Sequence, residues 1–159
     1  MSELKDAGIM FRMILQAITQ AGINPSAMLS RLGVTPEYLQ SRDLRTPHNA
    51  QLLFWDAVEA ISQDPDIGLH LGQHLPVFRG QVLEYLFLSS PTFGEGLKRA
   101  LNYQRLISDA SDAEVVVDQD TCFMKMKTAS DEVGRLRHFN ECFAQGLTDF
   151  FAFVTDQKF

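Results

Sequence analysis

The sequence predicts an α+β fold that is predominantly α-helical, a bundle of short helices packed on a small antiparallel β-sheet. Two observations support this prediction. Apolar residues recur at helical spacing from residue 5 to about residue 108, and again after residue 134. Between these stretches, residues 113–118 and 121–128 have the β-branched content and the alternation of two β-strands.

The N-terminal part begins with a predicted helix over residues 5–21, whose apolar stripe includes Ile9, Met13 and Ala17. Further helices are predicted where a good capping residue precedes proline. A capping side chain satisfies an unpaired amide, and proline at the first helical position has no amide to satisfy. The four pairs are Asn24-Pro25, Thr35-Pro36, Thr46-Pro47 and Asp64-Pro65. They predict helices near residues 25–32, 36–41, 47–62 and 65–74.

Residues 80–108 are predicted to form two helices that are separated at Ser89-Ser90-Pro91. Residues 80–89 are almost entirely apolar, which predicts a central, buried helix. Pro91 keeps the preceding residue out of the helical conformation. Thr92 and Glu95 have the spacing of a capping box, in which the Thr92 hydroxyl accepts from the Glu95 amide and Glu95 accepts from the Thr92 amide. The inner face of this second helix is expected to hold Leu97, Ala100, Leu101 and Leu106.

The two predicted strands meet at a turn, Gln119-Asp120. Along the second strand Cys122, Met124 and Met126 share one face, with Phe123, Lys125 and Lys127 on the other. A final helix over residues 134–156 places Phe139, Phe143, Leu147, Phe150 and Val154 at helical spacing. Because an isolated hairpin is only marginally stable in water, we expect the final helix and further strands to cover it.

Composition excludes several classes of function. At 159 residues the chain is predicted to be a single domain with a sizeable core. A net charge of −6, with scattered basic residues, gives no attraction to phosphate, so this chain is not expected to bind DNA directly. The longest apolar runs are too short to cross a bilayer. The first residues lack the pattern of a secretory signal. These features predict a cytoplasmic protein that does not bind membranes.

The candidate chemical groups do not form a catalytic set. His70 and His74 have a metal-ligand spacing, but zinc needs a third protein ligand, and a solvated helix face explains them better. Cys122 and Cys142 are expected to be buried small hydrophobes. The chain contains no Gly-x-Ser-x-Gly and no phosphate-binding glycine loop. We therefore expect no catalytic residues, no metal and no cofactor, and a protein that is not an enzyme.

Tyr103, Arg105 and Ser108 are the candidate ligand-binding residues. They lie where the second helix of the pair leads into the first strand, and junctions of helices and sheets are places where small-molecule pockets form. Arg105 can pair with an acidic ligand. It can equally be a surface arginine, or pair with a carboxylate such as Asp109, and the sequence leaves these alternatives open.

A family resemblance rests on the motifs LSSPTFGEGL at residues 88–97 and YQRLISD at residues 103–109. Residues 24–33, 45–47, 64–72 and 80–85 fit the same pattern. Together they resemble the N-terminal regulatory domain of AraC-type transcription regulators, in the branch with an arabinose-binding N-terminal domain. The resemblance covers about residues 10–157. It does not establish a sugar ligand, since members of this branch respond to varied effectors.

The resemblance implies a bacterial regulator whose N-terminal domain senses a small molecule or mediates self-association, while C-terminal helix-turn-helix units bind DNA. Residues 1–159 are then one effector-sensing and oligomerisation domain, cut from a longer chain and truncated at its C-terminal side. The implied partners are an effector of unknown identity, a second copy in a homodimer, and DNA only through the missing C-terminal domain. Residues 150–159 are expected to be partly uncovered. The alternatives are a ligand-free interaction and dimerisation module and, more remotely, a metal protein using His70 and His74.

Overall fold

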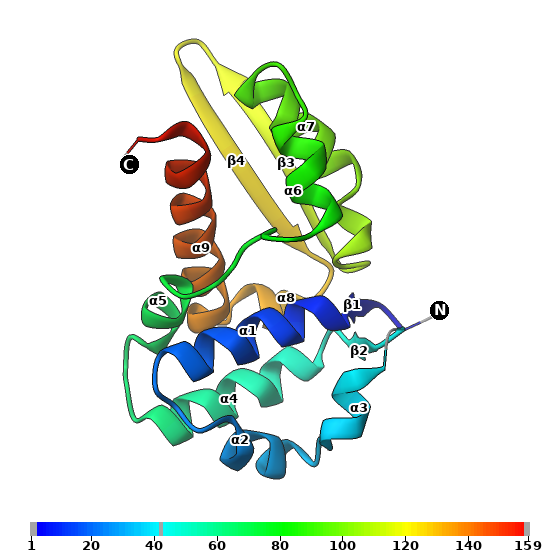
Figure 1. Cartoon of the computed structure of the whole chain (residues 1–159), viewed down its shortest axis with the longest axis vertical. Helices are drawn as coiled ribbons and strands as arrows, with labels where there is room; N and C mark the ends of the chain where they lie inside the picture. Colours follow the sequence, from blue (N-terminus) through cyan, green and yellow to red (C-terminus); the bar gives the residue numbers. More distant parts are fainter. Residues whose placement is uncertain (1–2, 42, 158–159) are drawn as a thin grey trace.

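The computed structural model describes residues 3–41 and 43–157 and confirms a predominantly helical α+β fold (Figure 1). The N-terminal elements are β1 (Lys5–Ala7), α1 (Gly8–Gln20), α2 (Pro25–Leu32), α3 (Pro36–Gln40), β2 (Arg45–Pro47), α4 (Ala50–Ser62) and α5 (Ile67–Gly72). They are followed by α6 (Val82–Leu88), α7 (Phe93–Asn102), the 3-10 helix η1 (Gln104–Leu106), β3 (Ser111–Asp118), β4 (Thr121–Thr128), α8 (Asp131–Gly134) and α9 (Arg137–Thr155).

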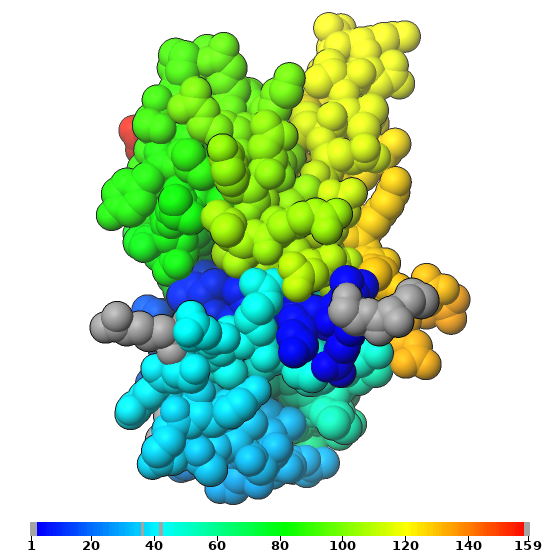
Figure 2. Space-filling view, turned by 90° about the vertical axis from the view of Figure 1, so that its right-hand side faces the viewer, coloured from blue at the N-terminus to red at the C-terminus, as the bar shows by residue number. Residues whose placement is uncertain are grey.

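The elements form two halves, and we call the junction between them the waist. The lower half in Figure 1 contains α1 to α5, and the upper half contains α6, α7 and the β3–β4 hairpin, with α9 running beside both. Figure 2 shows the N-terminal segment, in dark blue, at the waist between the cyan and the green and yellow regions. The side chains of Ile14, Ala17, Trp55 and Leu71 are among those buried in the core of the lower half.

Aromatic side chains continue this core into the upper half. Phe87 of α6 makes edge-on contacts with Phe93 of α7 and with Phe150 of α9, with ring centroids 5.3 and 5.4 Å apart. Phe78, in the segment before α6, contacts the same Phe150 ring at 5.4 Å. Such pairs contribute about 0.5–1.5 kcal/mol beyond the area they bury. They hold α9 against the helices of the upper half.

Several predicted helix starts are confirmed by their caps. Asn24 accepts a hydrogen bond from the amide of Ser26, and Thr35 accepts one from that of Tyr38. Thr92 accepts from the Glu95 amide at 3.3 Å, so the first half of the predicted capping box is present. In each case the cap lies within a few residues of its partner, which is why the sequence alone locates it.

The predicted starts of two other helices are wrong. Residues 5–7 are a strand rather than the beginning of a helix, and they pair antiparallel with Arg45–Pro47. The Thr46-Pro47 pair consequently lies in β2, and α4 begins only at Ala50. Both corrections have one physical reason: the backbone of residues 5–7 finds its hydrogen-bond partners about 40 residues away, which no local pattern records.

The helix predicted from Asp64-Pro65 is shorter than expected, since α5 begins at Ile67 and ends at Gly72. The Asp64 side chain accepts a hydrogen bond from the amide of Asp66 at 2.9 Å. This local turn competes with a helical conformation at the same residues. Asp64 therefore ends the preceding loop instead of capping the helix.

The prediction of a central, buried helix at residues 80–89 is also wrong. Helix α6 buries Leu83 and Phe87, but Tyr85 is 67% exposed, and Val82 and Leu88 are exposed with it. Apolar residues thus lie on two sides of α6, but the rest of the protein packs against only one of them. The next helix is shorter than predicted as well: α7 ends at Asn102, and Leu106, expected on its inner face, lies exposed on η1.

The hairpin and the last helix are confirmed with small changes at their ends. Strands β3 and β4 pair antiparallel, from Ser111 opposite Thr128 to Asp118 opposite Thr121. Each of the sheets within residues 3–41 and 43–157 contains two strands. Near the end of α9 Phe150 is buried and Phe153 is exposed. The expectation of an uncovered end also included Phe159, which lies outside the described residues.

Candidate functional site

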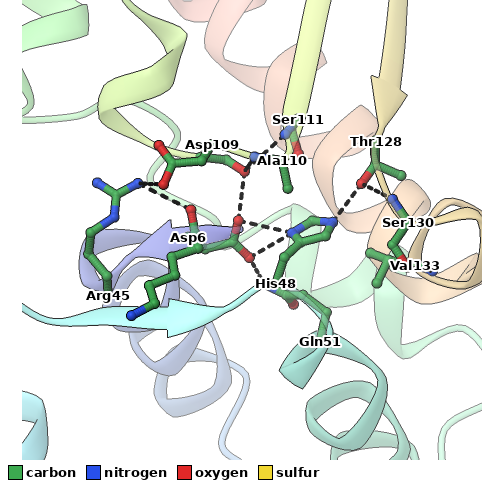
Figure 3. A network of polar contacts seen from close by, with 12 residues as sticks. Asp6, Arg45, His48, Gln51, Asp109, Ala110, Ser111, Thr128, Ser130 and Val133 are labelled. Atoms are coloured by element: carbon green, nitrogen blue, oxygen red, sulfur yellow. Dashed lines mark hydrogen bonds and ion pairs between the residues drawn. The ribbon is translucent and has the colours of Figure 1, made fainter. Parts of the chain in front are cut away.

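A network of buried polar side chains lies at the waist of the molecule and centres on Asp6 (Figure 3). Asp6, on β1, is 0% exposed. Both of its carboxylate oxygens lie 3.0 Å from Nδ1 of His48, which therefore carries a proton that it donates. Gln51 donates to one carboxylate oxygen at 3.0 Å, and the Ser108 hydroxyl donates to the other at 2.6 Å. The carboxylate thus joins three segments that are distant in the sequence.

The same network holds both ends of the β3–β4 hairpin. The Ser108 hydroxyl accepts hydrogen bonds from the amides of Ala110 and Ser111, where β3 begins. Nε2 of His48 lies 2.5 Å from the Thr128 hydroxyl, at the last residue of β4. We call Asp6, His48, Gln51, Ser108 and Thr128 the buried clamp. It connects the hairpin of the upper half to β1 and α4 of the lower half.

Burial and hydrogen bonding shift the pKa of Asp6 in opposite directions. Burial raises the pKa of its carboxyl group because a charged group loses its hydration. The hydrogen bonds from His48, Ser108 and Gln51 stabilise the charged form and together outweigh burial, so that the pKa of Asp6 lies below its ordinary value. Asp6 is consequently an ionised carboxylate at neutral pH, compensated by its donors.

Thr128, His48 and Asp6 follow the order of nucleophile, base and orienting acid that occurs in hydrolases. That chemistry requires a substrate to reach the hydroxyl. His48 is only 3% exposed, and neither His48 nor Thr128 lines the cavities described below. The buried clamp therefore acts as a cross-link between the hairpin and the helices.

Beside the clamp is a small apolar cavity of about 90 Å³. Its lining comes from α1, the loop before α6, the helices α6 and α7, η1 and the residues after it, the hairpin and α9. Its apolar lining consists of Met10, Met13, Val77, Phe78, Leu83, Ala100, Ile107, Ala113, Met124, Met126, Phe139, Phe143 and Leu147. Its polar lining consists of Gln104, Ser108, Ser111 and Asp112. Ser108 thus belongs both to this apolar cavity and to the buried clamp.

The three candidate ligand-binding residues lie in different environments. Ser108 is buried and lines the apolar cavity. Tyr103 follows the last residue of α7 and is exposed, and Arg105 is exposed on η1. Neither of these two side chains lines the cavity. The fold therefore places one of the three at the junction of helices and hairpin, and the other two on its outer surface.

Sequence reasoning missed Asp6 and His48, the centre of the buried clamp. They are 42 residues apart, and Asp6 and Ser108 are 102 residues apart. The apolar pattern predicts a helix at residues 5–7, and a lone aspartate on such a helix is expected to be solvated. No local spacing marks these side chains as partners, so a signal for them exists only in three dimensions.

A larger groove of about 350 Å³ lies on the other side of α4, against α2 and α3. Its walls include Phe11, Leu32, Val34, Tyr38, Leu53 and Phe54. Tyr38 and Leu53 are exposed, so this groove is open to solvent. It shares no residue with the hairpin.

His70 and His74 do not come together as metal ligands. Nδ1 of His70 lies 2.6 Å from a carboxylate oxygen of Asp64, and this hydrogen bond raises the pKa of His70 above its ordinary value. Within residues 3–41 and 43–157, no group of three histidine, cysteine or acidic side chains is placed to hold a metal ion. His70 thus forms a hydrogen bond with Asp64 at the protein surface.

The two cysteines differ in their exposure, contrary to expectation. Cys142 is buried on α9, as predicted, and burial raises the pKa of its thiol to about 12. Cys122 is exposed, so its prediction as a buried hydrophobe is wrong. It lies near the tip of the hairpin, opposite Val117, which is also exposed. The alternation of β4 showed which residues share a face but not how far that face is covered.

This difference predicts the result of thiol labelling. In the native protein a maleimide is expected to modify Cys122 rapidly and leave Cys142 unmodified, because Cys142 is inaccessible and its thiolate is suppressed. Cys142 should react only after unfolding in denaturant. Intact-mass spectrometry of native and unfolded samples, with Cys122→Ser as control, measures both. Rapid double labelling of the native protein would contradict the structure.

No helix in the described part of the chain is long and apolar enough to cross a membrane. Comparison with known proteins identifies relatives. The family model described as the arabinose-binding domain of AraC transcription regulators, N-terminal, matches residues 22–159. An ornithine utilization regulator from Pseudomonas aeruginosa is 32% identical over 111 residues, which cover 66% of this chain and 31% of that protein. The chain belongs to the family of arabinose-binding N-terminal domains of AraC transcription regulators and is a regulatory domain.

Proposed function

We propose that this regulatory domain senses a small-molecule effector in the bacterial cytoplasm and forms a homodimer, and that both events control DNA binding by a separate C-terminal domain. The family match and the regulator named among the relatives support this proposal. The match spans about a third of that relative's length, which leaves room in such a protein for a DNA-binding domain.

The observation that carries the sensing proposal is the apolar cavity that shares Ser108 with the buried clamp. Ligand sites are concave, largely apolar and often located between structural elements. An effector that fills this cavity would contact α1, α9 and the hairpin together. It would also press on Ser108, whose hydroxyl holds Asp6 at 2.6 Å. Tyr103 and Arg105 remain predictions as ligand contacts, on the outer side of the same junction.

The mechanism that follows is a population shift. An effector that prefers one position of the hairpin relative to the helical half favours that arrangement, by an amount equal to its difference in affinity. Such a coupling is typically about 1–3 kcal/mol. In this proposal the buried clamp transmits the difference, because it fixes both hairpin ends to β1 and α4.

Thermal unfolding and titration calorimetry test the sensing proposal, against a panel of amino acids (including ornithine), sugars, fatty acids, nucleotides and small apolar molecules such as benzene and indole. A true effector at a hundred times its dissociation constant should stabilise the domain by about 2.7 kcal/mol. The matched control is a compound of the same class that gives no heat of binding. If no compound in the panel binds or stabilises, effector sensing is refuted.

The second candidate function is a ligand-free dimerisation or docking module. The exposed apolar face of α6, formed by Val82, Tyr85 and Leu88, favours it. Light scattering of the wild type and Tyr85→Glu separates the two candidates. A dimer that dissociates in Tyr85→Glu, in a protein that binds no effector, would establish the interaction module in place of the sensor.

A further inference from the structure

The polar groups around the apolar cavity are already used by the protein. The amide of Gln104 donates to Asp112 at 2.7 Å and to the carbonyl of Ala113 at 3.2 Å, and its oxygen accepts from the Ala113 amide at 2.6 Å. The Ser108 hydroxyl donates to Asp6 and accepts from two amides. Neither side chain has a strong hydrogen bond left to offer a ligand. Ser111 adds a single uncharged hydroxyl.

The cavity also lacks a pair of charges that would receive a zwitterion. Asp112 is the one charged residue in its lining. Asp112 is exposed, and one of its oxygens already accepts from Gln104. An amino acid bound in this cavity would bury a carboxylate with no cation in the lining to pair with it, and its desolvation would not be repaid. Zwitterionic and anionic effectors are therefore excluded from the interior of the cavity.

We propose that the effector of this domain is a small apolar molecule, aliphatic or aromatic, with at most one uncharged hydrogen-bonding group. The inference rests on the proposed sensing function and specifies its ligand class. It contrasts with the charged amino acid in the name of the Pseudomonas aeruginosa relative. The lining favours this class because most of the side chains that a ligand would contact are apolar.

Four methionines determine how large this molecule can be. An apolar cavity of about 150 Å³ holds benzene in another protein, whereas this one measures about 90 Å³. Met10, Met13, Met124 and Met126 line it, and methionine side chains move readily to fill or vacate irregular space. Met126 is 47% exposed, so the cavity reaches the surface beside this side chain. The lining thus adapts to a ligand of benzene or indole size and provides an entry.

The test uses benzene and indole as probes and the methionine methyl groups as reporters. Nuclear magnetic resonance of protein labelled at the methionine methyls should show ring-current shifts at Met10, Met13 and Met124 that saturate with probe concentration. The methyl of Met28, which is buried on α2 and absent from the cavity lining, serves as the internal control. Saturable shifts confined to the cavity support the proposal.

A pair of leucine substitutions on β3 provides the matched variants. Ala113→Leu places an isobutyl group in the cavity and should weaken benzene binding at least about tenfold, because the space is already filled. Glu114→Leu places the same side chain on the opposite, exposed face of the strand and should leave the affinity unchanged. Equal affinities in both variants would overturn the cavity as the site.

Two outcomes separate this inference from the proposed function. If the cavity methyls do not respond to benzene or indole while ornithine or another charged compound stabilises the domain, the apolar ligand class is wrong and sensing stands. If neither class binds, the cavity is a packing void and both proposals fail. The methyl measurement on the wild-type protein remains decisive even if Ala113→Leu does not fold.

Discussion

Asp6→Ala is expected to lower the free energy of unfolding by about 3–5 kcal/mol, because it removes a buried carboxylate from the donors that compensate it. The carboxylate is 0% exposed and accepts from His48, Gln51 and Ser108. Its removal leaves these three buried donors without their acceptor, and the dry site gives them little water in return. Both ends of the hairpin lose their connection to the lower half.

Chemical denaturation, monitored by circular dichroism, measures this loss of stability. Asp120→Ala is the matched control, since Asp120 lies exposed in the turn of the same hairpin. The control is expected to change stability by no more than about 0.5 kcal/mol. If Asp6→Ala unfolds at the same denaturant concentration as Asp120→Ala, the buried clamp does not stabilise the fold.

The same residue predicts an acid dependence of stability. The pKa of Asp6 is lower in the folded protein than its ordinary value of 3.8. The unfolded chain therefore takes up the proton first, and the contribution of Asp6 is fully present above pH 3.8 and lost as the pH falls below it toward the folded pKa. Asp6→Ala should remove this part of the acid dependence. An unchanged pH profile of the variant would contradict the assignment.

Gly68→Ala is expected to cost about 2–3 kcal/mol, because α5 and α9 pack with their backbones in contact. A Cβ atom at Gly68 would lie 2.6 Å from both Cα and the carbonyl oxygen of His138. These are backbone atoms at the start of α9, so they cannot rotate away. The two helices must separate, and the packing around Leu71 and Cys142 must loosen with them.

Gly94→Ala is the matched control for this substitution. Gly94 is also helical, on α7, but a Cβ there would meet no atom within 4 Å. Alanine in place of glycine raises helix propensity by up to about 1 kcal/mol and lowers the entropy of the unfolded chain. Gly94→Ala should therefore leave stability unchanged or raise it. Melting temperatures that move equally in both variants would exclude a close contact of α5 with α9.

The features that could be predicted from the sequence depend on short-range physics. The Thr92 cap, the Asn24 cap and the turn at Gln119-Asp120 each involve residues within a few positions of one another. Alternation along β4 likewise follows from the geometry of a single strand. Composition and motif content were sufficient to identify the class of regulatory domain, which the family match confirms.

The predictions that are wrong concern side chains whose burial depends on neighbours that are distant in the chain. Apolar content at residues 80–89 predicted a buried helix, yet α6 leaves Tyr85 exposed because the fold covers one of its faces. Cys122 lies on the predicted strand, but the cover over that strand does not extend to it. In both cases hydrophobicity showed that a side chain could be buried, and only the packing decided that it is not.

By itself the sequence determined the helical class, the caps, the hairpin and the regulatory family, because local backbone preferences and side-chain periodicity carry that information. Only the tertiary structure decided the candidate site. Asp6, His48 and Ser108 meet through contacts that span 42 and 102 residues, and the adjoining cavity takes its lining from seven elements and two loops. The burial of a charge and the lining of a cavity depend on residues that are far apart in the sequence. These residues come together only when the chain has folded.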